Sequence, residues 1–406
     1  MTKKTLRFQV GIILMALVVS IMIPLSASGA QNNAKTIKLG VVANLGWALG
    51  VDFKKVLDVI VPLYNEKGGL VINGERYDFK IIFYDSKLNP EVGRAAVERL
   101  VYQDKVKFIL GDETVDAWLP VTEQNKVLAI VTTPSPAIFN PEYKYVFNST
   151  FLNTRPPAMW GWFAQTHPDV KSWSGVYFDN MLGHILAGQC KKLAETFGQK
   201  TKSVTFVPPE TSDFGAVATK LRLSNPDMVV MLGAGEVPFA NLAKSLHEAG
   251  WKGIHFAYVG VMIDMVSEII PLSIIEGMIT SEDAVRLDSP PLPAKQLKDA
   301  YVEKRGSWDN PSTMFVNNWY LFKAALEKAQ SLDVEKIASM IGKGMRWEAT
   351  EGMSMLVPRK DMGNERACDA VLPSYVRRLE GGKMKLIHTI SPEEAFKSCE
   401  KFYGWK

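Results

Sequence analysis

Short apolar runs alternate with longer amphipathic segments along most of this chain, and no other feature constrains its fold as strongly. The apolar runs show little polar alternation, which is typical of strands buried on both faces of a parallel sheet. The segments between them place apolar residues at helical spacing. We therefore predict an α/β fold of doubly wound parallel sheets. The expected strands are 37–43, 79–85, 106–111, 127–133, 173–179, 202–208, 227–233 and 254–260, and the expected helices are 52–64, 90–102, 115–125, 182–197, 214–223 and 238–249.

The alternation falls into two series, which indicates two lobes rather than one large sheet. The first series starts at Thr36 and ends near Thr133, and the second restarts at Trp173. The stretch 151–157, which contains two consecutive prolines, lies between them. After Gly277 the pattern becomes less regular. There we predict a proline-rich loop at 288–293, helices over 294–305, 311–329 and 333–342, and a hairpin over 376–387 that turns at Gly381 and Gly382.

The first thirty residues have the three-part pattern of a secretory signal peptide. A basic start precedes an apolar run over 10–25 and the small-residue sequence SASGA, so cleavage is expected after Ala30. A transmembrane anchor is the alternative reading of the same run. The run is short for a membrane span and is interrupted by Ser20 and Pro24, so we favour an exported, soluble mature chain.

The net charge of the mature chain says little about its partners. The chain has a formal charge of +4, and the signal segment contributes three basic residues and no acidic one, which leaves about +1. A nucleic-acid-binding surface would need clustered lysines and arginines, and the sequence has no such cluster. We expect no nucleic-acid partner.

Three cysteines are present, at positions 190, 368 and 399. In an oxidising compartment Cys368 and Cys399 are candidates for a disulfide, which would stabilise the fold by roughly 3–4 kcal/mol in the chain-entropy model. Three reduced, buried thiols are the alternative, because a sequence does not show whether two Cβ atoms come within reach. Both alternatives stay open at this point.

No motif in the chain predicts an enzyme. The turn GAGEVP at 233–238 resembles a dinucleotide-binding turn, but it lacks the third glycine and no acidic residue ends the next strand. An ordinary strand-to-helix turn is therefore favoured. Ser135 lies between two prolines without a supporting histidine, which argues against a nucleophile. The five histidines have no paired metal-binding spacing. We expect no catalytic residue, no cofactor and no metal.

Two stretches with polar residues follow neighbouring strands of the first series. Asp112, Glu113 and Asp116 could surround a cation, or they could cap the start of a helix, where acids are favoured. The stretch TTPS at 132–135 follows the next strand along the chain. Because the carboxyl ends of parallel strands meet at one edge of the sheet, a small ligand could be held there. Simple capping is the alternative.

Six stretches, in a fixed order, resemble the type I periplasmic solute-binding proteins, in particular the branched-chain amino acid group of ABC importers. The resemblance covers most of the mature chain. The stretches are IKLGVVANLG from Ile37, the segment from Tyr64 to Thr114, LAIVTTPSPA at 128–137, GVYFDNMLG, DMVVMLGAGEVPFANLAKSLHEAGW and FVNNWYLFKAALEKA.

This resemblance implies a periplasmic monomer with two α/β lobes and a three-segment hinge. A small-molecule solute would bind in the cleft between the lobes, and hinge closure would present it to the membrane subunits of an ABC permease. On this basis we expect residues 36–152 plus 282–345 in lobe 1 and 153–281 plus 346–406 in lobe 2. A ligand sensor of the same fold and an exported enzyme are the alternative functions.

The resemblance also implies ligand contacts on the first lobe, where this sequence departs from the family. Members offer hydroxyl groups to the ligand carboxylate from the loop that matches GDETV, and here only Thr114 fits, beside Glu113. In the next loop Ser135 matches a contact residue. Pro136 lacks an N–H donor and Ala137 lacks a hydroxyl at places where an amino-acid binder would use both.

The second lobe departs from the family in the same direction. The aromatic residue expected before the glycine of one loop is Leu182, and the acid expected to neutralise an α-amino group is Gly260. A buried ammonium group without a carboxylate is costly. Glu236, in the neighbouring loop, could replace that acid or could be an ordinary acid of a first helical turn.

The amino-acid clamp is therefore incomplete, and the remaining residues suggest another solute. Trp47, Met181, Leu182 and Tyr258 would form an apolar, partly aromatic cleft suited to a hydrophobic or aromatic carboxylate. Packing of Trp47 inside its own lobe is the alternative for that residue.

Overall fold

A computed structural model describes residues 34–112 and 114–405. The predicted signal peptide and Glu113 lie outside the described residues. The first sheet has the strand order β2-β3-β1-β4-β5-β6 and is parallel except for the β2–β3 pair. Its strands are β1 (Lys35–Ala43), β2 (Leu70–Ile72), β3 (Glu75–Asp85), β4 (Phe108–Gly111), β5 (Leu128–Val131) and β6 (Val146–Asn148).

The helices around this sheet bury their apolar faces in a common first core. They are α1 (Ala48–Glu66), α2 (Pro90–Tyr102), α3 (Leu119–Gln124), α9 (Leu292–Arg305), α10 (Asn317–Ala329) and α11 (Val334–Gly342). Helix α2 begins where predicted, because the Asn89 side chain accepts hydrogen bonds from the N–H groups of Glu91 and Val92. The helix predicted over 311–329 begins only at Asn317, after the loop that contains Pro311.

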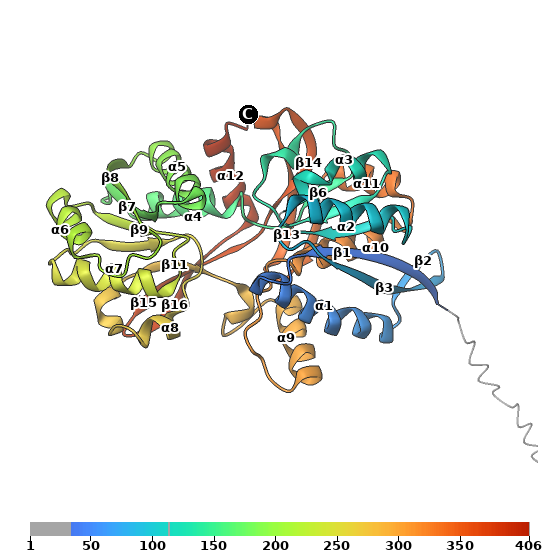
Figure 1. Cartoon of the computed structure of the whole chain (residues 1–406), viewed down its shortest axis with the longest axis horizontal. Helices are drawn as coiled ribbons and strands as arrows, with labels where there is room; N and C mark the ends of the chain where they lie inside the picture. Colours follow the sequence, from blue (N-terminus) through green and yellow to red (C-terminus); the bar gives the residue numbers. More distant parts are fainter. Residues whose placement is uncertain (1–33, 113, 406) are drawn as a thin grey trace, which may run out of the picture. The chain divides into compact units, whose positions relative to one another are not determined.

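The second sheet combines strands from two distant parts of the chain, as the colours in Figure 1 show. Its order is β16-β15-β11-β10-β9-β7-β8, with β7 to β11 parallel and β15 and β16 antiparallel. The strands are β7 (Ser172–Phe178), β8 (Lys200–Val207), β9 (Met228–Met231), β10 (Ile254–Ala257), β11 (Ile279–Glu282), β15 (Ser374–Glu380) and β16 (Lys383–Ile390). The predicted hairpin turns at Gly381 and Gly382, whose φ values of +59° and +74° favour glycine.

A second core surrounds this sheet and is separate from the first. Its helices are α4 (Arg155–Thr166), α5 (Met181–Thr196), α6 (Gly215–Ser224), α7 (Glu236–Glu248), α8 (Ile263–Ser267) and α12 (Pro392–Tyr403). Helix α12 packs on α4 and begins with a capping box formed by Ser391 and Glu394. The stretch predicted as a linker at 151–157 ends inside α4, because Pro156 and Pro157 fit the first turn of a helix. The predicted two-lobe α/β fold is confirmed.

A third, antiparallel sheet lies in the last part of the chain, with β12 (Arg346–Ala349), β13 (Gly352–Arg359) and β14 (Asn364–Val371). Most of its buried apolar residues, such as Trp347 and Leu356, belong to the first core, and Val357 and Val371 belong to the second. The chain passes between the two cores at 149–154, 283–291 and 372–373. The predicted residue boundaries of the two lobes stay a prediction.

Charged residues in and beside the crossings lie close together. Arg155, directly after the first crossing, is only 3% exposed, and its Nη1 lies 3.5 Å from Asp283 Oδ1 at the second crossing. Glu351 lies between β12 and β13, and its Oε2 accepts a hydrogen bond of 2.9 Å from the N–H of Ala284. Burial, followed by the charge of Asp283, raises the pKa of Glu351 to about 8. An acid that is costly to ionise therefore lies against the second crossing.

All three cysteines are buried, free thiols in the structure. The Sγ atom of Cys399 donates to the carbonyl oxygen of Thr154 at 3.6 Å, and burial raises the pKa of the Cys368 thiol to about 12. The structure therefore has reduced thiols at Cys368 and Cys399, for which the sequence allowed either a disulfide or free thiols.

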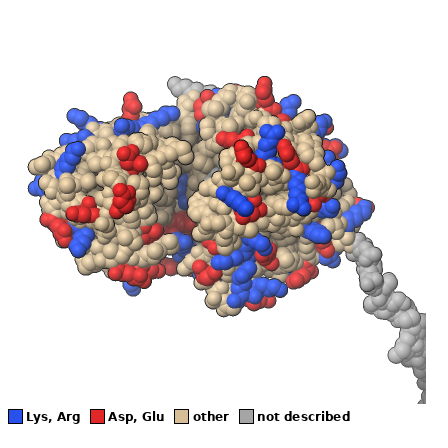
Figure 2. Space-filling model, in the orientation of Figure 1, with Lys and Arg blue, Asp and Glu red and all other residues tan. Residues whose placement is uncertain are grey.

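The visible face in Figure 2 carries lysine and arginine side chains interspersed with aspartate and glutamate. Within residues 34–112 and 114–405, no helix combines the length and the hydropathy that crossing a membrane requires.

Candidate functional site

The loops that follow the parallel strands of the first sheet are tied together by carboxylates. Asp85 Oδ1, after β3, accepts a hydrogen bond of 3.0 Å from the N–H of Leu45, after β1. Ser86 Oγ donates to Asp112 Oδ2 at 2.6 Å, which joins the loops after β3 and β4. These bonds fix the edge at which α/β proteins bind ligands.

The two hydroxyl groups predicted as ligand contacts on this edge already have partners. Thr114 is buried, and its Oγ1 donates to Asp112 Oδ1 at 2.7 Å. Ser135 Oγ donates to Asp116 Oδ2 at 2.8 Å and accepts from the N–H of Ala137 at 3.2 Å. Both hydroxyls therefore donate to protein carboxylates, which leaves an anionic ligand without these donors.

Three other predicted contacts of the first lobe reach solvent. Pro136 and Ala137 are exposed in the short helix that starts at Pro136. Trp47, immediately before α1, is 40% exposed, so part of its ring is available to a ligand.

The geometry of Asp112 and Asp116 does not support the cation site that the acidic stretch suggested. In the described part of the chain, no group of three or more His, Cys, Asp or Glu side chains is placed to hold a metal ion.

The strand-end loops of the second sheet also lie side by side. Leu182, at the start of α5, lies against Gly233, since a methyl group on Gly233 would be 3.5 Å from Leu182 Cδ2. Glu236 lies in the first turn of α7, and its Oε1 accepts from the N–H of Met262 at 3.3 Å. Leu182 and Glu236 thus lie at one edge, and Gly260 belongs to the loop whose Met262 contacts Glu236.

Apolar side chains cover much of this second edge. Met181 is 81% exposed, and Leu182, Val259, Met262 and Met265 are exposed as well. Exposed apolar side chains that gather at the ligand-binding edge of a sheet are typical of a site for an apolar ligand.

Tyr258, which the sequence places in the cleft, is turned into the core of the second sheet instead. It is 3% exposed, and its hydroxyl donates to Gln189 Oε1 at 2.6 Å. Because the tyrosine follows β10 directly, its side chain lies on one of the two faces of the sheet. It lies on the face that α5 covers, where Gln189 is located. Its ring does not add an aromatic wall to the cleft.

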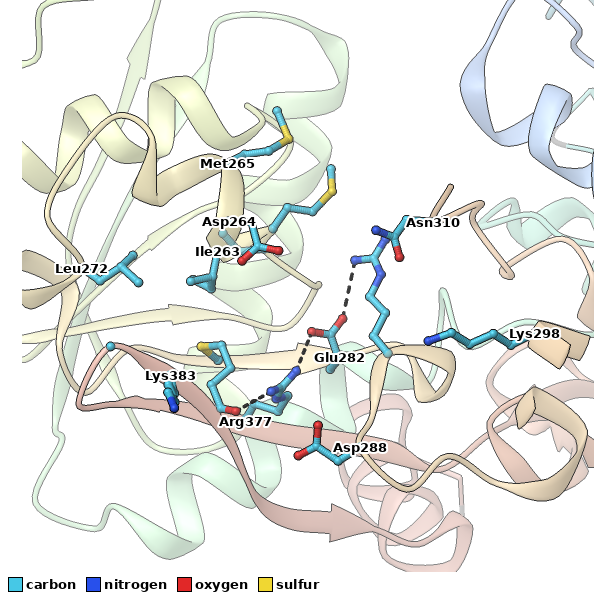
Figure 3. A pocket seen from close by; sticks show the side chains of 15 residues that line it. Ile263, Asp264, Met265, Leu272, Glu282, Asp288, Lys298, Asn310, Arg377 and Lys383 are labelled. Carbon is cyan, nitrogen blue, oxygen red and sulfur yellow. Dashed lines mark hydrogen bonds and ion pairs between the residues drawn. The ribbon is translucent and has the colours of Figure 1, made fainter. Parts of the chain in front are cut away.

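A pocket of about 640 Å³ opens beside the loop that follows β10. Figure 3 shows Glu282 in its wall next to Arg377, with Lys298 and Asn310 on the opposite side. The lining residues are Val261, Met262, Ile263, Asp264, Met265, Leu272, Glu282, Arg286, Asp288, Lys298, Asn310, Arg377, Gly382, Lys383 and Met384.

Ion pairs between Glu282 and two arginines form this wall, which we call the pocket floor. Arg377 Nη1 donates to Glu282 Oε2 at 3.1 Å, and Arg286 Nη1 lies 3.6 Å from Glu282 Oε1. Burial raises the pKa of Glu282, the charge of Asp283 acts in the same direction, and the two arginines oppose them. The carboxylate of Glu282 is thus held by protein cations.

Sequence reasoning misses these pocket residues because no local signal connects them. Arg377 pairs with Thr280 through the antiparallel contact of β15 with β11, across nearly one hundred residues of chain. Glu282 ends the last parallel strand and Arg286 follows it, in a stretch without a recognisable motif. An acid at the end of a strand, followed four residues later by an arginine, is the weak signal that was available.

The family model of the periplasmic binding proteins matches residues 36–378 of this chain. Solved structures with the same fold share little sequence with it. One is a solute-binding protein of an ABC transporter from Rhodopseudomonas palustris in complex with 3,4-dihydroxybenzoic acid, at 21% identity and a TM-score of 0.64, with 88% of this chain and 98% of that chain covered.

Two further structures extend the comparison. A leucine-binding protein from Thermotoga maritima is 21% identical with a TM-score of 0.63, and the match covers 88% of this chain and 99% of that chain. A branched-chain amino acid ABC transporter ligand-binding protein from Burkholderia xenovorans is 17% identical with a TM-score of 0.70, with 89% and 96% covered.

Proposed function

Because the chain belongs to the periplasmic binding protein family, we propose that it is the extracytoplasmic solute-binding component of an ABC importer. In this role it captures a small organic solute in the periplasm, closes around it and presents the closed form to a membrane permease. The signal-like start of the sequence agrees with export to that compartment. Capture and delivery require no chemical reaction.

The pocket beside Glu282 is the observation that carries this proposal. Its walls include Arg377, on β15 of the second sheet, and Met262, directly before α8. Lys298, on the other side, belongs to α9, which buries Leu297 and Tyr301 in the first core. A hinge motion at the crossings would change such a pocket, so a solute that contacts both walls would favour the closed form.

For the solute, we propose a hydrophobic or aromatic carboxylate rather than an α-amino acid. The position expected to hold the acid for an amino group is Gly260, and the nearby Glu282 is occupied by two arginines. Neither position therefore offers an ammonium group a free, buried carboxylate, and the two other acids of the pocket, Asp264 and Asp288, are exposed to solvent. Met262 and Met265 offer apolar surface instead.

The solutes of the structural relatives define a practical panel. Besides the 3,4-dihydroxybenzoic acid complex, one relative from Rhodopseudomonas palustris was solved with 4-hydroxybenzoate and another with benzoate. We propose thermal-shift measurements with these three acids, leucine and valine. A solute at about 100 times its Kd stabilises the folded state by about 2.7 kcal/mol. For a chain of this length that corresponds to a rise in Tm of about 3–4 °C.

At least one aromatic acid should raise the Tm, and the amino acids should not. Met262→Asp, which places a charge in the pocket wall, should abolish the shift. Met353→Asp is the matched control, because Met353 is similarly exposed, at 45% against 41% for Met262, and does not line the pocket. Stabilisation by leucine or valine alone would contradict the proposed solute class. Equal loss of the shift in both variants would contradict the proposed pocket.

A further inference from the structure

The edge of the first sheet is poorly suited to hold a carboxylate in this protein. Thr114 and Ser135 donate their hydroxyl protons to Asp112 and Asp116. An incoming carboxylate would have to displace these partners and would face two like charges nearby. If the solute is an acid, as the proposed function states, its carboxylate needs a different partner.

Arg286 has hydrogen-bond donors to spare inside the pocket. Within the described residues, the partner of its guanidinium group is Glu282, at 3.6 Å, which is beyond hydrogen-bond distance. Arg377 holds the other oxygen of Glu282 at 3.1 Å and so compensates that charge. An arginine presents five N–H groups in a plane that matches a carboxylate in a two-bond arrangement.

The other charges of the pocket leave the space around Arg286 favourable to an anion. Four basic and three acidic side chains line the pocket. Asp264 and Asp288, the acids besides Glu282, are exposed, so water screens their charges. Lys298 approaches from the opposite wall and adds a second cation (Figure 3).

Gly260 supplies the room for such a group. A Cβ atom at this position would lie 3.6 Å from the carbonyl oxygen of Ser281 and 3.8 Å from Glu282 Oε1. A longer side chain there would extend toward the ion pairs of the pocket floor. The glycine keeps this approach open, and the exposed side chains of Met262 and Met265 line the same pocket as Glu282.

We propose that Arg286 binds the carboxylate of the captured acid, with the apolar part of the solute resting on Met262 and Met265. This inference rests on the proposed function and specifies how its site distinguishes an acid from a neutral or cationic molecule. It places the anion near the hinge crossing at 283–291 rather than at the hydroxyl groups of the first lobe.

Calorimetric titration of matched acid and amide pairs tests this assignment. The probes are 4-hydroxybenzoate with 4-hydroxybenzamide and benzoate with benzamide, titrated into wild type, Arg286→Gln and Arg378→Gln. Arg378 is the control, because it carries the same charge on β15, pairs with Glu380 and does not line the pocket. Loss of a charge-assisted hydrogen bond should weaken binding of the acid by about 10- to 100-fold in Arg286→Gln.

The ratio of acid to amide affinity separates recognition from a structural role. Arg286→Gln should lower this ratio at least about tenfold, whereas Arg378→Gln should leave it unchanged. Arg286→Lys, which keeps the charge without the planar donor pair, should lie between wild type and Arg286→Gln. An unchanged ratio in Arg286→Gln would overturn the inference alone. Wild type that binds neither acid would overturn the proposed solute class together with it.

Discussion

Replacing Glu351 with glutamine should stabilise the protein at alkaline pH and leave it unchanged at acidic pH. Burial, with the charge of Asp283 as the second cause, raises the pKa of this acid from 4.5 to about 8. Between these values the folded state keeps a proton that the unfolded chain has lost, so stability falls as the pH rises. Above about pH 8 the folded state contains a buried carboxylate whose Oε1 has no hydrogen-bond partner among the described residues.

The size of the effect follows from the two pKa values. Each unit of difference corresponds to about 1.4 kcal/mol, so the ceiling is about 5 kcal/mol at pH 9. An unfolding entropy of about 2.1 cal/mol/K per residue gives roughly 0.8 kcal/mol/K for this chain, and hence a rise in Tm of up to about 6 °C. At pH 5 glutamine resembles the protonated acid and still offers an oxygen to the N–H of Ala284.

Scanning calorimetry from pH 5 to pH 9 measures this difference. The difference in Tm between Glu351→Gln and wild type should grow from pH 5 to about pH 8 and level off above it. Groups that titrate in both proteins cancel in the comparison. Glu348→Gln serves as the control, because Glu348 is exposed on the neighbouring strand β12 and its replacement should give a constant difference. Parallel curves for Glu351→Gln and wild type would refute the buried-acid argument.

Three further predictions concern other parts of the molecule. Gly260→Glu has room for its Cβ atom and would place a carboxylate near Glu282, so binding of an aromatic acid should weaken at least about tenfold by calorimetry, and unaltered affinity would contradict the pocket assignment. Burial lowers the pKa of His255 from 6.5 to about 4, so the free energy of unfolding should fall by about 3 kcal/mol as the pH is lowered from 6.5 to 4. In His255→Phe, urea titrations should show a smaller loss of the free energy of unfolding over this pH range. An unchanged pH dependence would contradict the role given to His255. Cys368 and Cys399 should resist a thiol reagent until the protein unfolds and then both react, whereas a Tm lowered by reducing agent would indicate a disulfide.

Local pattern is sufficient for most elements of the two parallel sheets. Helix α2 matches its predicted range, 90–102, because Asn89 and Pro90 mark its start in the sequence itself. The hairpin β15–β16 is also visible locally, since two adjacent glycines allow the tight turn. The short strands β2 and β6 were not predicted, because three-residue strands carry too little periodicity to be distinguished from loops. The three-stranded sheet was not predicted either, although β13 and β14 have eight residues each.

The candidate site could be predicted only in part. Leu182, Glu236 and Gly260 follow parallel strands, whose carboxyl ends meet at one edge, and their role as ligand contacts stays a prediction. The partners of Thr114 and Ser135 are not visible in the sequence. The hydroxyls donate to Asp112 and Asp116, respectively. The sequence does not show which way these acidic side chains point, and only the folded loops do.

The sequence by itself determined the alternation of strands and helices and the division into two series. These depend on residue types and spacing, which act locally. The tertiary structure decided which charges surround the pocket, since the pairing of β15 with β11 brings Arg377 to Glu282 from a distant part of the chain. It also decided that Tyr258 is buried, because the choice between the two faces of a strand depends on what packs against them.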